Sequence, residues 1–496
     1  MKNLINSKFI LAVLVAVSMT TACTKLTTVE TDSTVTSGAA GFKPGDPAAL
    51  LTSAYAKMDV FTDQANIYSL GEHTSGEMIP PTRGVDWGDN GVWRTLDAHT
   101  WDATHSWMTN AWNQLNERAY NCNEILASTP SPAQAAEAKF IRALYTSYVL
   151  DFWGQVPIRQ VTEGAEINPK VMTRAQAFDA CVADLTDALP GLDKIGPNAT
   201  NTKASKAAAN FLLAKLYLNK GVYTAANPAG PYTFDKGDMD KVVAYCDAIT
   251  ADGFGLEDQY FDNFSKASTK EVILTSTNGS PSNRWFMTLH YNQDPSGWNG
   301  FTTLADFYGK FDKADQRIGI APKKDKSAFA GIGKGFLVGP QFKGDGSALI
   351  DERSQIQLSF TPDVLLAGAN TAMGIRTIKY HPADAGKYIL MRNGAAQVMK
   401  IEALQKGGKA AEALVAINVL RVKRGLGVLT ALTDDGVFDE ISRETYWEGS
   451  ARTNEIRFGK FLTGTGVTKR DAGTVLFPIP ASAIVSNPNL KQNAGY

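Results

Sequence analysis

The segment formed by residues 136–157, AEAKFIRALYTSYVLDFWGQVP, restricts the possible folds of this chain more than any other. Its apolar residues recur at i, i+3, i+4, i+7 and i+11, which places them on one face of an α-helix: Ile141, Leu144, Tyr145, Tyr148 and Phe152. Gly154 and Pro157 then end the helix. Because so aromatic a face needs partners of the same kind, the segment predicts an assembly of packed helices.

Other parts of the chain repeat this helical pattern. Helical periodicity is found in residues 48–61, 109–127, 174–189, 205–220, 238–252, 393–405 and 409–423. Helix-turn-helix units of about thirty to forty residues are typical of tetratricopeptide-like repeats. We therefore predict a mainly α fold, a tetratricopeptide-like helical-repeat scaffold with large loop insertions near residues 71–106 and 254–391.

The helix predicted at residues 205–220 is apolar on almost every side. Its polar residues form one narrow strip, made of Lys206, Asn210, Lys215 and Asn219. This pattern predicts a helix that is buried on most sides, with Gly221 as its C-cap.

The N-terminus has the pattern of a secretory signal. Lys2 and Lys8 precede a short apolar run, and small residues then lead into Cys23. Ala22 followed by Cys23 resembles a bacterial lipobox, whose cysteine is acylated and becomes the first mature residue, although Thr20 stands where a Leu is usual. We predict a lipoprotein signal peptide at residues 1–22, a lipidated flexible tether at residues 23–47 and a single domain at residues 48–496. An ordinary signal peptide with an incidental cysteine is the alternative.

Charge and cysteine content exclude several classes of protein. The chain has 49 Lys and Arg against 50 Asp and Glu, so no net positive field predicts nucleic-acid binding. Cys122, Cys181 and Cys246 lie in helix-like sequence, which favours buried free thiols over disulfides or a metal site. We predict no cofactor, while a structural divalent ion stays open.

The candidate binding surface is the loop of residues 72–107, which carries Trp87, Trp93, Trp101 and Trp107. An exposed Trp can stack on the apolar face of a sugar, while Asp, Asn and Arg hydrogen-bond to its hydroxyls. We expect Trp101 and Trp107, next to a helix start, to pack onto the helices. For Trp87 and Trp93, flanked by Gly and Asp, packing and sugar stacking are equally open.

A second loop, residues 294–301, contributes Trp298 and Asn299 and could face the first loop across a cleft. We predict that seven residues of the two loops bind a ligand. Trp87, Trp93 and Trp298 would stack on sugar rings, and Arg83, Asp86, Asp89 and Asn299 would hydrogen-bond to hydroxyls.

A catalytic function has less support in the sequence. A glycoside hydrolase needs two carboxylates roughly 5 to 9 Å apart, for which Asp86 with Asp89, or Glu72 with Glu77, could be nominated. Their spacing does not distinguish them from solvated acids, and no HExxH, GxSxG or Walker motif appears in a credible context. We predict a binding protein that is not an enzyme. A lipid-anchored glycoside hydrolase and a protein-binding or adhesion lipoprotein remain the alternatives.

Several stretches together resemble the SusD/RagB family of outer-membrane nutrient-binding lipoproteins. They are residues 151–157, 205–217, 418–425, 443–459 and 477–496. The resemblance implies a helical body with four tetratricopeptide-like units, attached through lipidated Cys23 to the outer membrane at the cell surface. It also implies capture of an oligosaccharide, or of another nutrient such as a peptide, and delivery to a SusC-like TonB-dependent transporter.

The chain departs from the family pattern at two places. After Cys23 comes Lys25, with no acid before Glu30, so the resemblance does not extend to an acidic surface-export signal. Where relatives carry a basic residue and an Asp just after Glu-Gly, this chain has Ala451 and Asn454. The resemblance therefore does not extend to a local ion pair with Arg452 or Arg457.

Overall fold

The computed structural model describes residues 41–463 and 471–496. The predicted signal peptide, Cys23 and most of the predicted tether lie outside the described residues. Residues 42–163 and 167–496 form one compact unit. Within the described part of the chain, no helix combines the length and the apolar character needed to cross a membrane.

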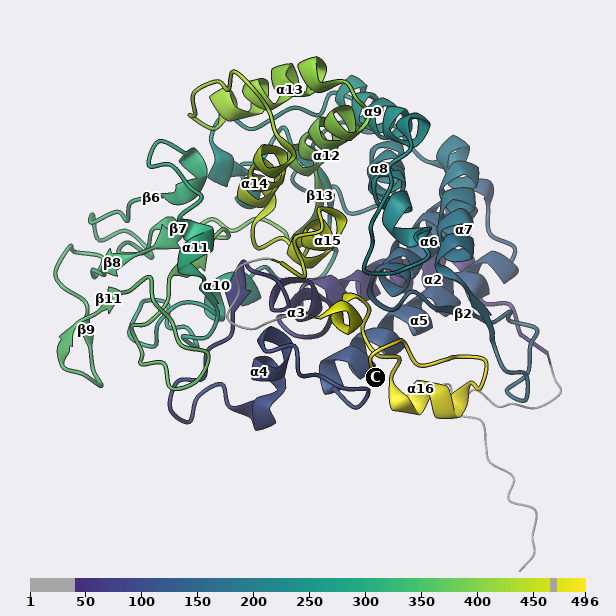
Figure 1. Cartoon of the computed structure of the whole chain (residues 1–496), viewed down its shortest axis with the longest axis horizontal. Coiled ribbons are helices and arrows are strands. Elements are labelled where there is room, and N and C mark those ends of the chain that lie inside the picture. The colour runs from purple at the N-terminus through teal and green to yellow at the C-terminus, as the bar shows by residue number, and fades with distance from the viewer. Residues whose placement is uncertain (1–40, 464–470) are drawn as a thin grey trace, which may run out of the picture. The chain divides into compact units, whose positions relative to one another are not determined.

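The predicted mainly helical fold is confirmed. The long helices are α2 (Pro47–Ala56, continued by η1, Lys57–Phe61), α5 (Ser106–Ala127), α6 (Pro132–Trp153), α7 (Arg174–Ala188), α8 (Lys206–Tyr223), α9 (Lys236–Ala251), α12 (Asn393–Lys406) and α13 (Ala410–Lys423). Sequential helices pack in pairs, α5 with α6, α8 with α9 and α12 with α13. Figure 1 shows these helices in an arc along the right and the top of the view.

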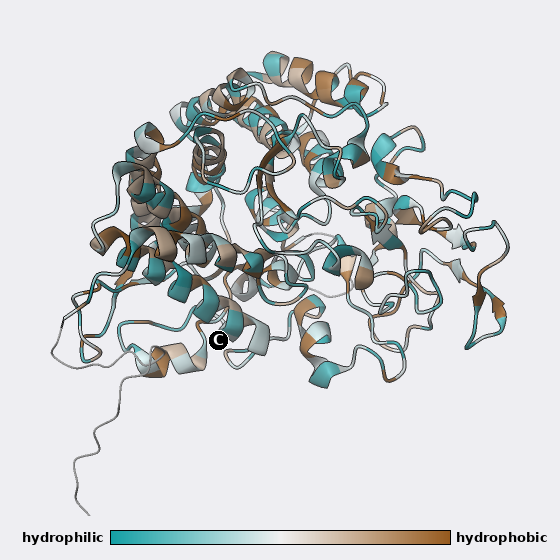
Figure 2. Ribbon diagram, turned by 180° about the vertical axis from the view of Figure 1, so that it is seen from behind, coloured by the Kyte–Doolittle hydropathy of each residue, from teal (hydrophilic) through white to brown (hydrophobic). Residues whose placement is uncertain are grey.

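Helix α6 forms as its sequence predicts. The Ser131 side chain and the Gln134 side chain build a reciprocal capping box at its start. Gly154 ends the helix in the left-handed conformation, with φ 70°. The predicted apolar face is buried, apart from half-buried Tyr148. In Figure 2 the helices carry alternating hydrophobic and hydrophilic segments, as expected for helices with one buried side.

Helix α8 differs from its prediction at its C-terminal end. It continues past Gly221 to Tyr223, so Gly221 is not its C-cap. A Cβ atom at Gly221 would lie 2.1 Å from the Thr233 carbonyl oxygen, so this position needs a residue without a side chain. The polar strip does not face solvent throughout, because Asn219 is buried and its Oδ1 accepts from Arg457 Nη1 at 3.0 Å.

The two predicted insertions contain short elements rather than long helices. The first holds α3 (Asn66–Glu72, at its start), β1 (Met78–Ile79), η2 (Asp89–Gly91) and α4 (Val92–Asp97). The second holds η4 (Tyr260–Phe264), β4 (Val272–Thr275), α10 (Asn283–Phe286), β5 (Thr302–Thr303), α11 (Ala305–Tyr308), η5 (Gln316–Ile318), β6 (Gly319–Ile320), β7 (Lys334–Leu337), β8 (Gly339–Pro340), β9 (Ile350–Asp351), β10 (Ile356–Gln357), β11 (Ser359–Phe360), β12 (Arg376–Ile378) and, at its end, β13 (Ile389–Arg392).

All strand pairs among the described residues are antiparallel. Strand β1 pairs with β5, β4 with β13, β8 with β11 and β9 with β10, while β6, β7 and β12 form a three-stranded sheet. The remaining pair joins β2 (Val156–Ile158) to β3 (Lys170–Met172). Because β1 belongs to the first insertion and β5 to the second, the two insertions are joined to each other.

The C-terminal part contains helices that the periodicity did not predict. These are α14 (Asp434–Thr445), α15 (Ala451–Arg457), η6 (Ala472–Val475) and α16 (Ala481–Ser486). Outside the C-terminal part, one short helix, η3 (Leu189–Gly191), directly follows α7. Buried Glu444 of α14 accepts hydrogen bonds from Arg317, Arg392 and Arg424, at 2.8 to 3.1 Å. These arginines lie in η5, at the end of β13 and just after α13, so Glu444 connects the second insertion to the helical scaffold.

The arginines near Ala451 and Asn454 have partners elsewhere in the chain. Arg457 forms an ion pair with Glu402 of α12 at 2.7 Å. The Arg452 Nη2 donates to the backbone carbonyls of Thr474 and Val475.

The three described cysteines, Cys122, Cys181 and Cys246, are free and buried, which confirms the prediction for them.

Candidate functional site

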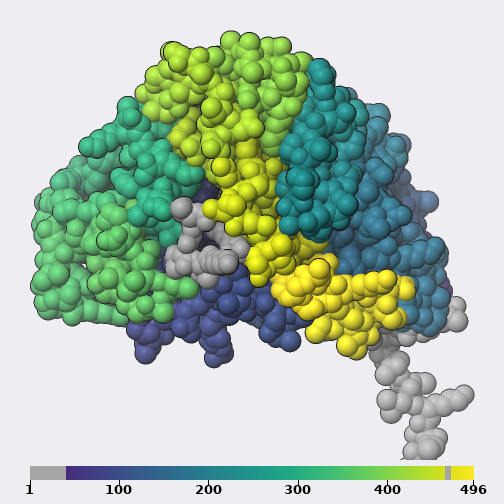
Figure 3. Space-filling view, in the orientation of Figure 1, coloured from purple at the N-terminus to yellow at the C-terminus, as the bar shows by residue number. Residues whose placement is uncertain are grey.

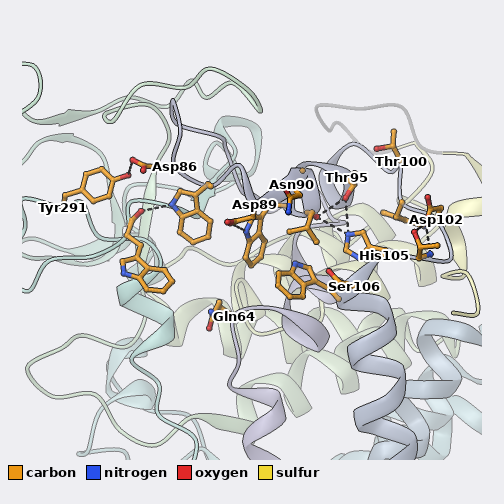
Figure 4. Close-up of a pocket in the computed structure, with 18 residues that line it drawn as sticks. Gln64, Asp86, Asp89, Asn90, Thr95, Thr100, Asp102, His105, Ser106 and Tyr291 are labelled. Atoms are coloured by element: carbon orange, nitrogen blue, oxygen red, sulfur yellow. Dashed lines mark hydrogen bonds between the residues drawn. The ribbon is translucent and has the colours of Figure 1, made fainter. Parts of the chain in front are cut away.

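A cleft of about 890 Å³ is lined mainly by the tryptophan-bearing segment of the first insertion. Residues 86–107 supply most of the wall, and Gln64 together with Tyr291 and Trp298 of the second insertion supplies the rest. Figure 4 shows Tyr291 and Asp86 at one end of the cleft and Asp102 and Thr100 at the other. In Figure 3 the blue segment with α4 lies at the lower edge, between the green second insertion and the yellow C-terminal part.

Unusual backbone conformations shape the loop that precedes α4. Trp87, Asp89 and Asn90 have φ values of 62°, 36° and 54°, in the region that residues other than glycine rarely adopt. Gly91, at φ 82°, follows them as the N-cap of α4. Such conformations each cost on the order of 1 kcal/mol or more and cluster at ligand sites. They turn the loop so that Trp87, Asp89 and Trp93 all line one cleft.

The tryptophans form a continuous row of ring contacts. Ring centroids lie 6.3 Å apart for Trp298 and Trp87, 5.4 Å for Trp87 and Trp93, and 5.4 Å for Trp93 and Trp107. The Trp87 Nε1 donates to the Trp298 carbonyl at 2.8 Å. The two loops therefore touch and line the cleft together, instead of facing each other across it as predicted.

The rings of this row differ in exposure. Trp298 is 49% exposed, Trp87 and Trp107 are half-buried, and Trp93 is buried. The Trp93 Nε1 donates to the Asp89 carboxylate at 2.7 Å, and its ring packs on Phe301. Trp298 thus offers the largest ring surface to a ligand, while Trp93 forms part of the wall.

Trp101 and Trp107 were expected to pack onto the body of the protein. Trp101 is buried, packs against Phe477 and donates through Nε1 to the Tyr496 hydroxyl at 2.5 Å. Trp107 packs against Trp93 but remains half-buried and also lines the cleft. Trp101 therefore has the expected packing role, and Trp107 belongs to the row.

One end of the cleft is organised around Asp86. Its Oδ2 accepts from the Tyr291 hydroxyl at 2.6 Å and from Arg353 Nη1 at 3.1 Å. The Arg353 guanidinium also lies over the Tyr291 ring, 4.6 Å from its centroid. Burial and the hydrogen bond to Asp86 raise the pKa of Tyr291 to about 12, so its hydroxyl stays protonated at neutral pH.

Two of the predicted ligand contacts, Arg83 and Asn299, have another role. Both are buried, at 2% and 0% exposure, and neither lines the cleft. The Arg83 Nε donates to the Asn299 carbonyl at 2.6 Å, and its Nη2 to the Met373 carbonyl at 2.8 Å. The Asn299 Oδ1 accepts from Arg376 Nη2 at 2.6 Å. Arg83 and Asn299 thus hold the Trp298 loop in place from beneath.

Sequence reasoning missed Tyr291 and Arg353. Each stands far from the tryptophan loop in the chain, and neither carries a local motif. Their place beside Asp86 depends on the docking of the second insertion on the first.

The two nominated carboxylate pairs lie in different environments in the structure. Asp86 and Asp89 line the cleft, whereas Glu72 and Glu77 are buried and do not. Glu72 accepts from the Gly449 amide, and burial raises its pKa to about 8. Glu77 accepts from the Trp447 amide at 3.4 Å.

Among the described residues, no cluster of three or more His, Cys, Asp or Glu could hold a metal ion.

Comparison with known proteins gives relatives along most of the chain. The starch-binding protein SusD of Bacteroides thetaiotaomicron is 22% identical over 513 residues, covering 84% of this chain and 88% of that protein. A SusD-like protein of Bacteroides ovatus is 24% identical over 229 residues, covering 43% of this chain and 40% of that protein. No protein-family model matches the sequence.

Solved structures share the fold. A SusD-like protein from Bacteroides fragilis superposes with a TM-score of 0.69 at 18% identity, covering 91% of this chain and 96% of that one. A laminarin-binding SusD-like protein gives 0.66 at 18% identity, over 92% and 100% of the two chains. Surface glycan-binding protein A from Bacteroides thetaiotaomicron, in complex with laminarihexaose, gives 0.65 at 16% identity, over 90% and 98%. The chain is thus similar to SusD over most of both chains and shares the fold of SusD-like proteins.

Proposed function

We propose that this protein captures an oligosaccharide in the tryptophan-lined cleft without transforming it. The observation that carries the proposal is half-exposed Trp298, which continues a row of rings and lines the same cleft as Asp86 and Asp89. An indole face matches the apolar C–H face of a pyranose, and carboxylates accept hydrogen bonds from its hydroxyls. Relatives named for binding starch and laminarin support this class of ligand.

Binding without catalysis agrees with the names of the relatives, which describe starch-binding and glycan-binding proteins. The cleft does contain two carboxylates, Asp86 and Asp89. Asp86 is engaged by Tyr291 and Arg353, and Asp89 by Trp93, so both have structural partners.

We further propose that the captured glycan is passed to a SusC-like TonB-dependent transporter and that lipid on Cys23 holds the protein at the outer membrane, on the cell surface. The lipobox-like Ala22–Cys23 and the family resemblance support both steps. Affinity purification of the full-length protein from detergent-solubilised native membranes tests the partnership. Recovery of a TonB-dependent transporter is expected, and its absence from the purified material would contradict this step.

The binding proposal is tested by measuring laminarin and starch binding with calorimetry and affinity electrophoresis. A Trp side chain carries about 150 to 250 Å² of surface. With 49% of Trp298 exposed, about 100 Å² is open to a sugar. Covering about half of that area is worth roughly 1.3 kcal/mol at about 25 cal/mol per Å². Trp298→Ala is therefore expected to weaken binding about tenfold.

Val419→Ala serves as the matched control, because Val419 is an exposed apolar residue of α13 outside the cleft lining. The Val419→Ala variant is expected to bind laminarin and starch with the same affinity as the wild type. A wild-type protein that binds no polysaccharide, or a natively folded Trp298→Ala variant with unchanged affinity, would refute the proposed site.

A further inference from the structure

The charged side chains that line the cleft share one sign. Among the described residues of the lining these are Asp86, Asp89 and Asp102, and no Lys or Arg accompanies them. The histidine of the same lining, His105, is buried, and burial lowers its pKa, so it carries no charge at neutral pH. The side chains that line the cleft therefore carry a net negative charge, of which Asp86 shares its part with Arg353.

Two of the guanidiniums near this lining are already engaged, and a third, that of exposed Arg94 on α4, lies beside Gly91 and is not itself part of the lining. Arg353 donates to Asp86 and lies over the Tyr291 ring. All three nitrogens of the Arg83 guanidinium donate to backbone carbonyls, those of Asn299, Asn370 and Met373. A guanidinium binds a carboxylate or sulfate well through two parallel N–H donors, and these two cations do not present such a pair to the cleft.

The lining carboxylates also have spare capacity to accept hydrogen bonds. Asp86 and Asp89 each receive their described side-chain hydrogen bonds on Oδ2 alone. Asp102 receives the amide and hydroxyl of Thr104 on Oδ1 alone. An ionised carboxylate only accepts, so the second oxygens need donors. Sugar hydroxyls can donate to these oxygens. An ionised uronate or sulfate ester group can only accept, and its negative charge repels the carboxylates of the cleft.

We infer that the cleft selects uncharged glycans and rejects polyanionic ones, such as polyuronates and sulfated polysaccharides. This inference rests on the proposed glycan-binding function and adds the charge class of the ligand. Two like charges about 4 Å apart repel by about 1 kcal/mol in water, which corresponds to roughly fivefold in affinity, and by more near a protein surface. With several carboxylates along the cleft, we expect at least about tenfold discrimination.

The experiment compares neutral polysaccharides with their carboxymethylated, negatively charged derivatives. Laminarin is paired with carboxymethyl-laminarin and amylopectin with carboxymethyl-amylopectin, and polygalacturonate serves as a natural polyanion. The wild type should bind the neutral member at least about tenfold more tightly at about 20 mM NaCl. The difference should shrink at about 300 mM NaCl, because salt screens the repulsion.

The double substitution Asp89→Asn with Asp102→Asn removes two lining charges and retains an oxygen to accept from Trp93 and Thr104. It should reduce the ratio of the affinity for the neutral glycan to the affinity for the carboxymethylated glycan by at least about fivefold. Glu412→Gln, at an exposed acid on α13 outside the cleft, is the control and should leave the ratio unchanged.

Each other outcome overturns a distinct claim. If the carboxymethylated forms or polygalacturonate bind more tightly, and Trp298→Ala abolishes that binding, the cleft binds glycans but the inferred charge class is wrong. A ratio that the double substitution leaves unchanged would also overturn the inference. If no polysaccharide binds, the proposed function fails and the inference fails with it.

Discussion

Asn299→Ala tests whether Asn299 holds the Trp298 loop or contacts a ligand. The Asn299 side chain is fully buried at φ 52°, within the second insertion. Its Oδ1 accepts from Arg376 Nε at 3.1 Å and Nη2 at 2.6 Å, and its Nδ2 donates to the Thr371 carbonyl at 2.9 Å. The substitution removes all three hydrogen bonds and leaves a buried guanidinium with fewer acceptors.

The size of the effect follows from these contacts. A hydrogen bond to a charged group contributes about 1.5 to 3 kcal/mol, and a neutral one about 1 kcal/mol. Alanine in the left-handed region costs about 1 to 2 kcal/mol more. Arg376 keeps its hydrogen bonds to the carbonyls of Met373 and Thr371, which limits the loss. We expect Asn299→Ala to lower the free energy of unfolding by about 3 to 5 kcal/mol, a large part of typical protein stability.

The assay is urea unfolding at equilibrium, followed by tryptophan fluorescence and circular dichroism. Asn299→Asp is the conservative variant, because aspartate tolerates positive φ and still offers oxygens to Arg376. It should lose at most about 1 kcal/mol. Asn90→Ala is the matched control, since Asn90 also has positive φ, at 54°, but is exposed and its side chain has no hydrogen bond among the described residues. Asn90→Ala should lower the free energy of unfolding by about 1 kcal/mol, which is the cost of alanine in the left-handed backbone region alone.

The reasoning would be refuted if Asn299→Ala were no more destabilising than Asn90→Ala. If, in addition, Asn299→Ala weakened glycan binding in a protein of unchanged stability, the original expectation of direct ligand contact would be restored.

Three further predictions concern the interior and the anchor. Glu444→Gln should lower the free energy of unfolding by about 3 to 5 kcal/mol, because it removes the buried negative charge that three arginines share. Denaturant unfolding checks this, and a loss within about 0.5 kcal/mol would contradict it. The pKa of Glu72 is raised by burial to about 8 from its ordinary 4.5, so the folded state binds more protons than the unfolded one between these pH values and stability should fall as pH rises through this window. Glu72→Gln should flatten that fall in unfolding curves taken at several pH values, and an unaltered slope would exclude Glu72 as its source. Cys23→Ser removes the proposed acylation site and should move the protein from the membrane pellet to the soluble fraction on immunoblots; retention in the pellet would argue against lipidation at Cys23.

The helical scaffold could be predicted because its signals are local. Apolar residues at helical spacing, a capping box at Ser131 and a terminating Gly154 specify α6 within one short stretch of chain. The same reasoning failed at Gly221, where the glycine serves a close approach of Thr233 rather than a helix end. Thr233 lies outside the helix, so its close contact with Gly221 cannot be predicted from the spacing of apolar residues within the helix.

Taken by itself, the sequence determined that helices dominate and that the tryptophan-rich loop, with Trp298 from a second loop, is the candidate ligand surface. The tertiary structure alone decided which polar side chains border the cleft. It buried Arg83 and Asn299 beneath the Trp298 loop and brought Tyr291 and Arg353 beside Asp86. The physical reason is that helix formation depends on neighbours a few residues apart, whereas burial and ion pairing depend on segments that meet only when the insertions dock.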